Sequence, residues 1–161
     1  MIGCGGSFST ATLGRRYLMP LPFEYQNASL EFERFMTDAR DYAGLATTNM
    51  AWNMVVGVLH TFRRRLTLHQ VIEFSSILPP VLRALFLEHW NPDQEVADFG
   101  TEEQLLAEVR SIRTEHNFSP PDAIAAVARA LRNRVEPREL ARALSQLPPG
   151  AAQFWADRGA A

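Results

Sequence analysis

The chain contains one pattern twice, at a spacing of 69 residues. Residues 55–86 align with residues 124–155 without a gap, and many apolar positions correspond. This spacing is longer than the period of ordinary solenoid repeats, so it indicates duplication of a small helical unit. Seven of the 32 aligned pairs are identical: Val58/Val127, Arg63/Arg132, Arg65/Arg134, Ser76/Ser145, Leu78/Leu147, Pro79/Pro148 and Pro80/Pro149.

Both copies have the hydrophobic spacing of α-helices. Apolar residues three and four apart predict helices over 30–44 and 49–65. The sequence therefore predicts an all-α fold of two pseudo-symmetric units, each of about four helices, packed as one compact helical bundle. Further helices are expected to begin at the capping boxes Thr67/Gln70 and Thr101/Gln104, at Ser119 as an N-cap, and at Pro79-Pro80, Pro137 and Pro148-Pro149 in first turns.

The boundaries of the two units follow from composition and periodicity. Residues 1–29 are predicted to be a poorly ordered N-terminal segment, and Met19 is a candidate true start because residues 1–18 are small, polar and without periodicity. The first helical repeat is placed at 30–92 and the second at 101–157. An acidic linker at 93–100 joins them, and residues 158–161 are expected to fray.

The core can be assigned from the same periodicity. The helix over 49–65 is apolar on nearly every side, so we expect it at the centre, with the thin alanine-rich stretch 123–131 against it. In the helix that follows Thr67, Val71, Ile72 and Phe74 are expected to face inward. The aromatic residues assigned mostly to the core are Trp52, Phe62, Phe74, Phe86, Trp90, Phe154 and Trp155.

Composition bounds the class of protein. The 161 residues are 47% hydrophobic and 21% charged, which is typical of a globular domain. There is no apolar run of about 18 residues, so no membrane segment is expected. Cys4 is the only cysteine, which suits a reducing compartment and fits a cytoplasmic protein.

Arginine clusters are the strongest candidates for a binding site. Arg63, Arg64 and Arg65 are echoed by Arg132 and Arg134, and such clusters could hold an anion, an RNA backbone or an acidic partner. The alternative is that each cluster closes the last turn of a helix and offsets the negative end of its dipole. A further candidate is Trp90, which follows a helix beside a turn, where an indole is either half-exposed at a contact surface or packed into the core.

The sequence gives little indication of a metal site, an acidic docking motif or a catalytic site. His69 and Glu73 are four apart, but two ligands are too few for zinc, and His60 is expected to be exposed because Arg129 replaces it in the second repeat. The acidic residues of 93–103 read as a solvated connector and a first helical turn rather than as a docking motif. No nucleophile elbow, P-loop or dinucleotide fingerprint occurs, so we expect no catalytic residue, metal or cofactor.

One ordered set of motifs resembles a known family. The segments that carry it are Arg63 to Leu66, Thr67 to Val71 and above all Leu78 to Pro92, which reads Leu-Pro-Pro, then Leu-Arg-Ala-Leu-Phe-Leu-Glu, then Trp-Asn-Pro. Over residues 30–157 the chain resembles the bacterial family called domain of unknown function 2267. The resemblance implies a helical, often duplicated fold and a bacterial cytoplasmic setting, and it implies no activity. The second repeat departs from the pattern at Gly150-Ala151-Ala152.

Three functions therefore stay open. The favoured one is a non-enzymatic helical interaction or scaffold module, for example in stress physiology, with a protein as its partner and a homo-oligomer compatible with the sequence. The alternative is a small-molecule-binding protein or enzyme with a pocket between the repeats. The third is an RNA or DNA binder that uses the arginine clusters, although a net charge of −2 argues against nucleic acid.

Overall fold

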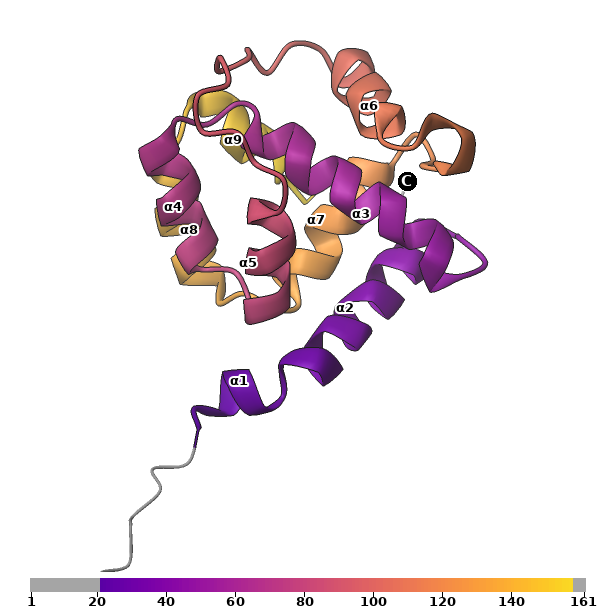
Figure 1. Cartoon of the computed structure of the whole chain (residues 1–161), viewed down its shortest axis with the longest axis vertical. Coiled ribbons are helices and arrows are strands. Elements are labelled where there is room, and N and C mark those ends of the chain that lie inside the picture. The colour runs from indigo at the N-terminus through magenta and orange to yellow at the C-terminus, as the bar shows by residue number, and fades with distance from the viewer. Residues whose placement is uncertain (1–20, 158–161) are drawn as a thin grey trace, which may run out of the picture.

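The computed structural model describes residues 21–157, which form helices joined by turns (Figure 1). The all-α prediction is confirmed. Met19, Cys4 and the tail 158–161 lie outside the described residues. The first half contains α1 (Phe23–Gln26), α2 (Ala28–Tyr42), α3 (Thr48–Arg63), α4 (Leu68–Ser76) and α5 (Pro80–Leu87). The second half contains α6 (Glu102–Ser111), the 3-10 helix η1 (Thr114–His116), α7 (Ala123–Arg132), α8 (Pro137–Ser145) and α9 (Pro149–Phe154).

Most helices begin where their capping residues predict. Thr67 and Gln70 form a capping box at the start of α4, and Thr101 with Gln104 does the same for α6. Proline occupies the first turn of α5, α8 and α9. These N-termini are therefore fixed by local sequence, because a capping side chain supplies an acceptor for an unpaired backbone N–H and proline has no such N–H.

Helix α7 is an exception, and the prediction of Ser119 as its N-cap is wrong. The helix begins only at Ala123. Ser119 is buried instead, and its hydroxyl donates to Oδ1 of Asn117. Asn117 donates in turn to the carbonyls of Val109 and Ile112 at the end of α6, at 2.8 and 2.9 Å. The segment is thus held against α6 and cannot open the next helix.

Helices α2 and α6 are the first helices of the two repeated units, and the two halves exchange them. Helix α2 packs most extensively along α7 of the second half, and α6 packs along α3 of the first half (Figure 1). Helices α3 and α7 also contact each other, as the alanine-rich sequence of α7 predicts. Neither half is therefore a separate bundle, because the principal neighbour of each first helix belongs to the other half.

Close approach of α3 and α6 depends on Gly57. A Cβ atom at this position would lie 2.6 Å from the backbone oxygen of Val109. The position aligned with Gly57 is Ala126 on α7, which faces α2 in the other half of the exchange. The α7 position carries the Cβ of alanine, so the requirement for glycine is confined to the α3 position of this aligned pair.

Aromatic rings from both halves form the centre of the core. The ring centroid of Phe62 lies 4.9 Å from that of Phe74 and 5.2 Å from that of Trp155. Trp155 also stacks on Phe74 at 5.9 Å. The core assignment of these residues is confirmed, and the core is shared between the halves.

Two assignments to the interior are wrong. Trp52 on α3 is 39% exposed, and its ring forms a T-shaped pair with that of Phe32, at 6.1 Å between centroids. Ile72 on α4 is 55% exposed. Helix α4 packs against α5 and α8, which cover its Val71 and Phe74 side and leave Ile72 uncovered.

The segment 93–100 crosses the end of α3 and anchors there. The backbone N–H of Ala97 donates to the carbonyl of Arg64 at 2.9 Å. The ring of Phe99 packs against Phe62 and Phe154, at 6.2 and 6.3 Å between centroids. Gly150 makes room for it, since a Cβ there would lie 2.4 Å from the Phe99 ring. This contact explains why glycine stands where the first half has valine.

Candidate functional site

The aligned arginines Arg63 and Arg132 have the same structural task. Arg63 ends α3 and donates to the carbonyls of Phe86 and Glu88, at 2.5 and 2.9 Å. Arg132 ends α7 and donates to the carbonyl of Trp155, the residue aligned with Phe86. Each guanidinium thus satisfies carbonyls at the C-terminal end of another helix, α5 or α9, which ordinary helix termini leave unpaired.

Arg65 and Arg134 pair with carboxylates of the opposite half. Arg65 makes a bidentate pair with Glu108 on α6, at 2.9 and 2.7 Å, and donates to the carbonyl of Thr61 at 2.7 Å. Arg134 pairs with Asp38 on α2 at 2.8 Å. These two ion pairs join each exchanged helix to the end of the helix on which it packs.

Of the six residues predicted as contacts, four are therefore engaged inside the molecule. The Arg65 contact with Thr61 lies in its own last helical turn, as the structural alternative expected, whereas Arg63 and Arg132 cap other helices. Arg64 differs, because its side chain is 45% exposed and only one oxygen of Glu108 lies near it, at 3.3 Å. Arg64 and Trp90 are the two candidates at the surface.

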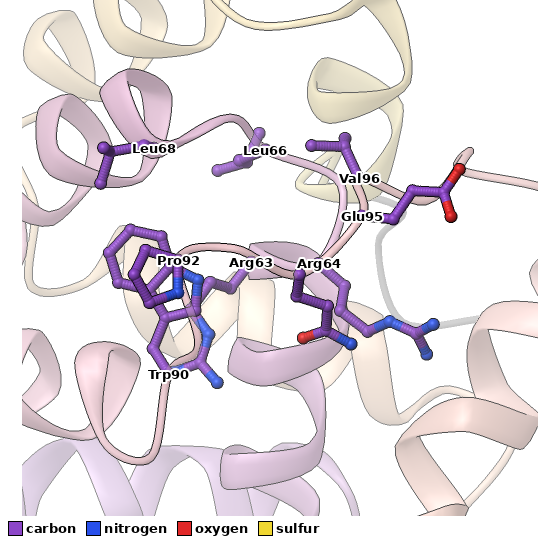
Figure 2. Close-up of a pocket in the computed structure, with 9 residues that line it drawn as sticks. Arg63, Arg64, Leu66, Leu68, Trp90, Pro92, Glu95 and Val96 are labelled. Atoms are coloured by element: carbon purple, nitrogen blue, oxygen red, sulfur yellow. The ribbon is translucent and has the colours of Figure 1, made fainter.

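Arg63, Arg64 and Trp90 line one small pocket beside the start of α4 (Figure 2). The turn between α3 and α4 and the segment after Trp90 form its walls. Leu68, Trp90 and Pro92 lie on one side of the pocket in Figure 2, and Arg64 and Glu95 lie on the other. The sequence motifs that lie far apart along the chain thus converge here.

The pocket itself is too small for a metabolite. Its volume is about 20 Å³, which is close to that of one water molecule. Arg63 lies at its inner side, where burial lowers the pKa of the guanidinium to about 10, so the side chain stays charged at neutral pH. We therefore regard the surface around the pocket, rather than its interior, as the candidate site.

An exposed apolar surface continues outward from the pocket, and we call it the α4 patch. Its members are Leu68, Ile72, Trp90, Pro92 and Val96. Leu68 and Val96 are 52% and 47% exposed, while Trp90 is half-buried against the core. Ile72 follows Leu68 by one helical turn, so the two side chains lie on one face of α4.

The second half has no equivalent surface on α8. Pro137 and Ala141 stand at the positions aligned with Leu68 and Ile72. Sequence reasoning found Trp90 but missed Leu68 and Ile72, because their spacing fits a buried face. The signal that could have found them is the loss of large apolar side chains at the aligned positions, since a shared core would keep them.

The histidines divide into one structural and several exposed residues. His60, expected to be exposed, is half-buried, and its Nε2 lies 2.9 Å from the carbonyl of Leu85. Burial lowers its pKa, so the neutral ring donates this bond. His69 and Glu73 form an exposed pair at 3.2 Å. No group of three or more metal-ligating side chains occurs within residues 21–157.

A wider depression lies between α4 and α8. Its volume is about 390 Å³, with Phe74, Ile77 and Leu147 among its apolar lining and Glu73 and Arg142 among its polar lining. Glu73 and Arg142 occupy aligned positions, so the two halves supply opposite charges to it. This depression lies between the two halves, where a small-molecule pocket was predicted. A second depression of about 440 Å³ also lies between them, with Glu31, Arg83 and Arg134 among its lining.

A comparison with protein families gives a match over most of the chain. The molecule is an all-α protein built from two halves that exchange their first helices. The family described as "Uncharacterized conserved protein (DUF2267)" matches residues 32–154, and the chain belongs to this family. The comparison with curated proteins found no match. In the part of the chain that is described, none of the helices has the length and apolar character to cross a lipid bilayer.

Proposed function

We propose that this protein is a non-enzymatic interaction module, acting in the cytoplasm, that binds another protein through the α4 patch. The observation that carries the proposal is the exposure of Leu68 and Ile72 on α4, where the aligned positions of α8 hold Pro137 and Ala141. A common helical frame does not require large apolar side chains there. The scaffold and stress-physiology roles expected from the sequence stay predictions.

The composition of the α4 patch supports a protein partner. Protein interfaces are enriched in aromatic residues, methionine and arginine and have an apolar centre with a polar rim. The patch has Leu68, Ile72 and Trp90 at its centre, with Arg64 and Glu95 beside it. Large exposed apolar side chains that lie together, rather than singly, are typical of interaction sites.

Capture from the cells that make the protein tests this proposal. Tagged wild-type protein is isolated under gentle conditions and its complexes are weighed by native mass spectrometry. The variant Leu68→Asp/Ile72→Asp should lose the bound protein, because it places two charges in the apolar centre. Ala141→Asp, at the position aligned with Ile72, is the matched control and should retain it. Equal capture by both variants would contradict the proposal.

A second function, binding of a small molecule between the halves, is favoured by the depression between α4 and α8. Its volume of about 390 Å³ falls within the usual range for ligand pockets. A ligand there would raise the melting temperature of the wild-type protein in a metabolite screen. The same ligand should lose its effect on Arg142→Ala, whose side chain borders the depression.

A further inference from the structure

The α4 patch is self-complementary, and we infer that its partner is a second copy of this chain, held by an antiparallel pair of α4 helices. The inference rests on the proposed function, because it names the occupant of the same surface. It uses four exposed side chains of α4, Leu68, His69, Ile72 and Glu73. Leu68 and Ile72 are separated by one helical turn, and so are His69 and Glu73.

The apolar pair matches itself when the helix is reversed. In a two-fold dimer residue i contacts residue j of the other subunit, and j contacts i. An antiparallel arrangement therefore places Leu68 of one copy against Ile72 of the other, twice. The two side chains are 52% and 55% exposed, so a partner helix can reach both.

The polar pair matches itself in the same arrangement. Within one chain, Nε2 of His69 lies 3.2 Å from a carboxylate oxygen of Glu73. With Leu68 level with Ile72 of the other copy, each His69 lies two residues, about 3 Å along the axis, from Glu73 of that copy, and the two long side chains can span this offset. A hydrogen-bond donor therefore faces an acceptor at both ends of the helix pair, which a parallel arrangement does not provide.

The second half disfavours other modes of self-association. A head-to-tail contact of α4 with α8 would place Leu68 and Ile72 against Pro137, Ala141 and charged neighbours such as Arg138. The contact of α4 with α4 closes by two-fold symmetry and leaves α8 free. Because α4 has only 9 residues, the interface is small, and we expect a weak dimer.

Analytical ultracentrifugation of the whole protein over a concentration series tests the inference. Wild-type protein should dimerise, and Leu68→Asp/Ile72→Asp should weaken the dimer by more than about tenfold, since charges replace the apolar centre. Ala141→Asp should dimerise like the wild type. Circular dichroism confirms that each variant is folded.

A charge-exchange pair gives a sharper test of the antiparallel register. His69→Glu and Glu73→His each place like groups opposite each other and should weaken self-association by about threefold. An equimolar mixture of the two variants should form a mixed dimer at wild-type strength, because every glutamate then faces a histidine. Recovery to wild-type strength, and not beyond it, is expected of an antiparallel pair. In a parallel pair the wild type would itself hold like groups opposite each other, and the mixed dimer would be stronger than the wild type.

The outcomes separate this inference from the proposed function. A protein that stays monomeric throughout the series, or a mixture that fails to recover, overturns the α4 dimer. If Leu68→Asp/Ile72→Asp still loses a captured partner of a different sequence, the proposed function stands and only the occupant is wrong. A dimer that is insensitive to Leu68 and Ile72 also overturns the inference.

Discussion

At the scale of single residues, the arginines show how two identical side chains acquire different tasks. Arg63 and Arg64 are neighbours, yet Arg63 is buried and satisfies two carbonyls of the α5 end, whereas Arg64 faces solvent. The identity of Arg63 with Arg132 therefore reflects a shared capping contact. The surface residue Arg64 aligns with Asn133, so it is not part of the structural pattern that the two halves share.

This division predicts unequal effects on stability. Arg63→Ala should lower the free energy of unfolding by about 2–3 kcal/mol, because it leaves the buried carbonyl of Phe86 and the partly buried carbonyl of Glu88 without this donor. Arg64→Ala should change it by less than about 0.5 kcal/mol, as is usual for surface positions. Urea denaturation measures both. Equal losses for the two variants would show that Arg63 is not the cap that its contacts indicate.

His60 gives the stability a specific pH dependence. Its pKa in the folded protein is lowered below 6.5 by burial, while the unfolded chain titrates near the ordinary value. Between these two values the unfolded chain binds more protons, so stability falls as the pH falls through this window. His60→Gln keeps an N–H donor for Leu85 but cannot titrate.

Urea denaturation from about pH 7.5 down to about pH 5 measures this contribution. The wild type should lose more stability over the range than His60→Gln. Parallel losses in the two proteins would mean that His60 does not contribute to the pH dependence.

At the scale of helices, the sequence predicts those helix starts that contacts within a single turn determine. The starts of α4, α5, α6, α8 and α9 follow from Thr–Gln boxes and prolines, which act within one turn. It misplaces the start of α7, because Asn117 binds the end of α6 across a loop. The sequence also predicts wrongly that Ile72 and Trp52 are buried. Periodicity shows which side of a helix is apolar, but it does not show whether a neighbouring helix covers that side.

The contact of α3 with α6 predicts an unusual response at Gly57. Alanine is normally the better helix former by about 1 kcal/mol. Here its Cβ would lie 2.6 Å from the Val109 oxygen, and the two backbones must separate. We expect Gly57→Ala to destabilise the protein by about 1–2 kcal/mol in thermal or urea unfolding. A stabilised variant would show that α6 does not lie this close to α3.

At the scale of the whole molecule, the exchange of first helices makes the two halves one folding unit. The pairs Arg65–Glu108 and Arg134–Asp38 each cross between the halves, and Phe62 packs on Trp155 of the second half. The sequence indicates duplication, but this exchange was not predicted, because hydrophobic spacing does not specify which helix covers a given face.

The exchange predicts a single unfolding transition. Circular dichroism and tryptophan fluorescence should give the same midpoint, and Glu108→Ala should lower that one midpoint by removing the partner of buried Arg65, at a cost of about 2–3 kcal/mol. Arg34→Ala, which breaks an exposed pair with Glu31, is the control and should cost less than about 1 kcal/mol. Two separate transitions would mean that the halves fold independently.

The central claim is that the frame common to both halves carries a binding surface on α4 alone. A photo-crosslinking amino acid placed at position 72, and separately at the aligned position 141, tests it most directly in living cells. We predict a discrete crosslinked protein species from position 72 and none from position 141. Equal products at both positions, or products only from position 141, would contradict the account.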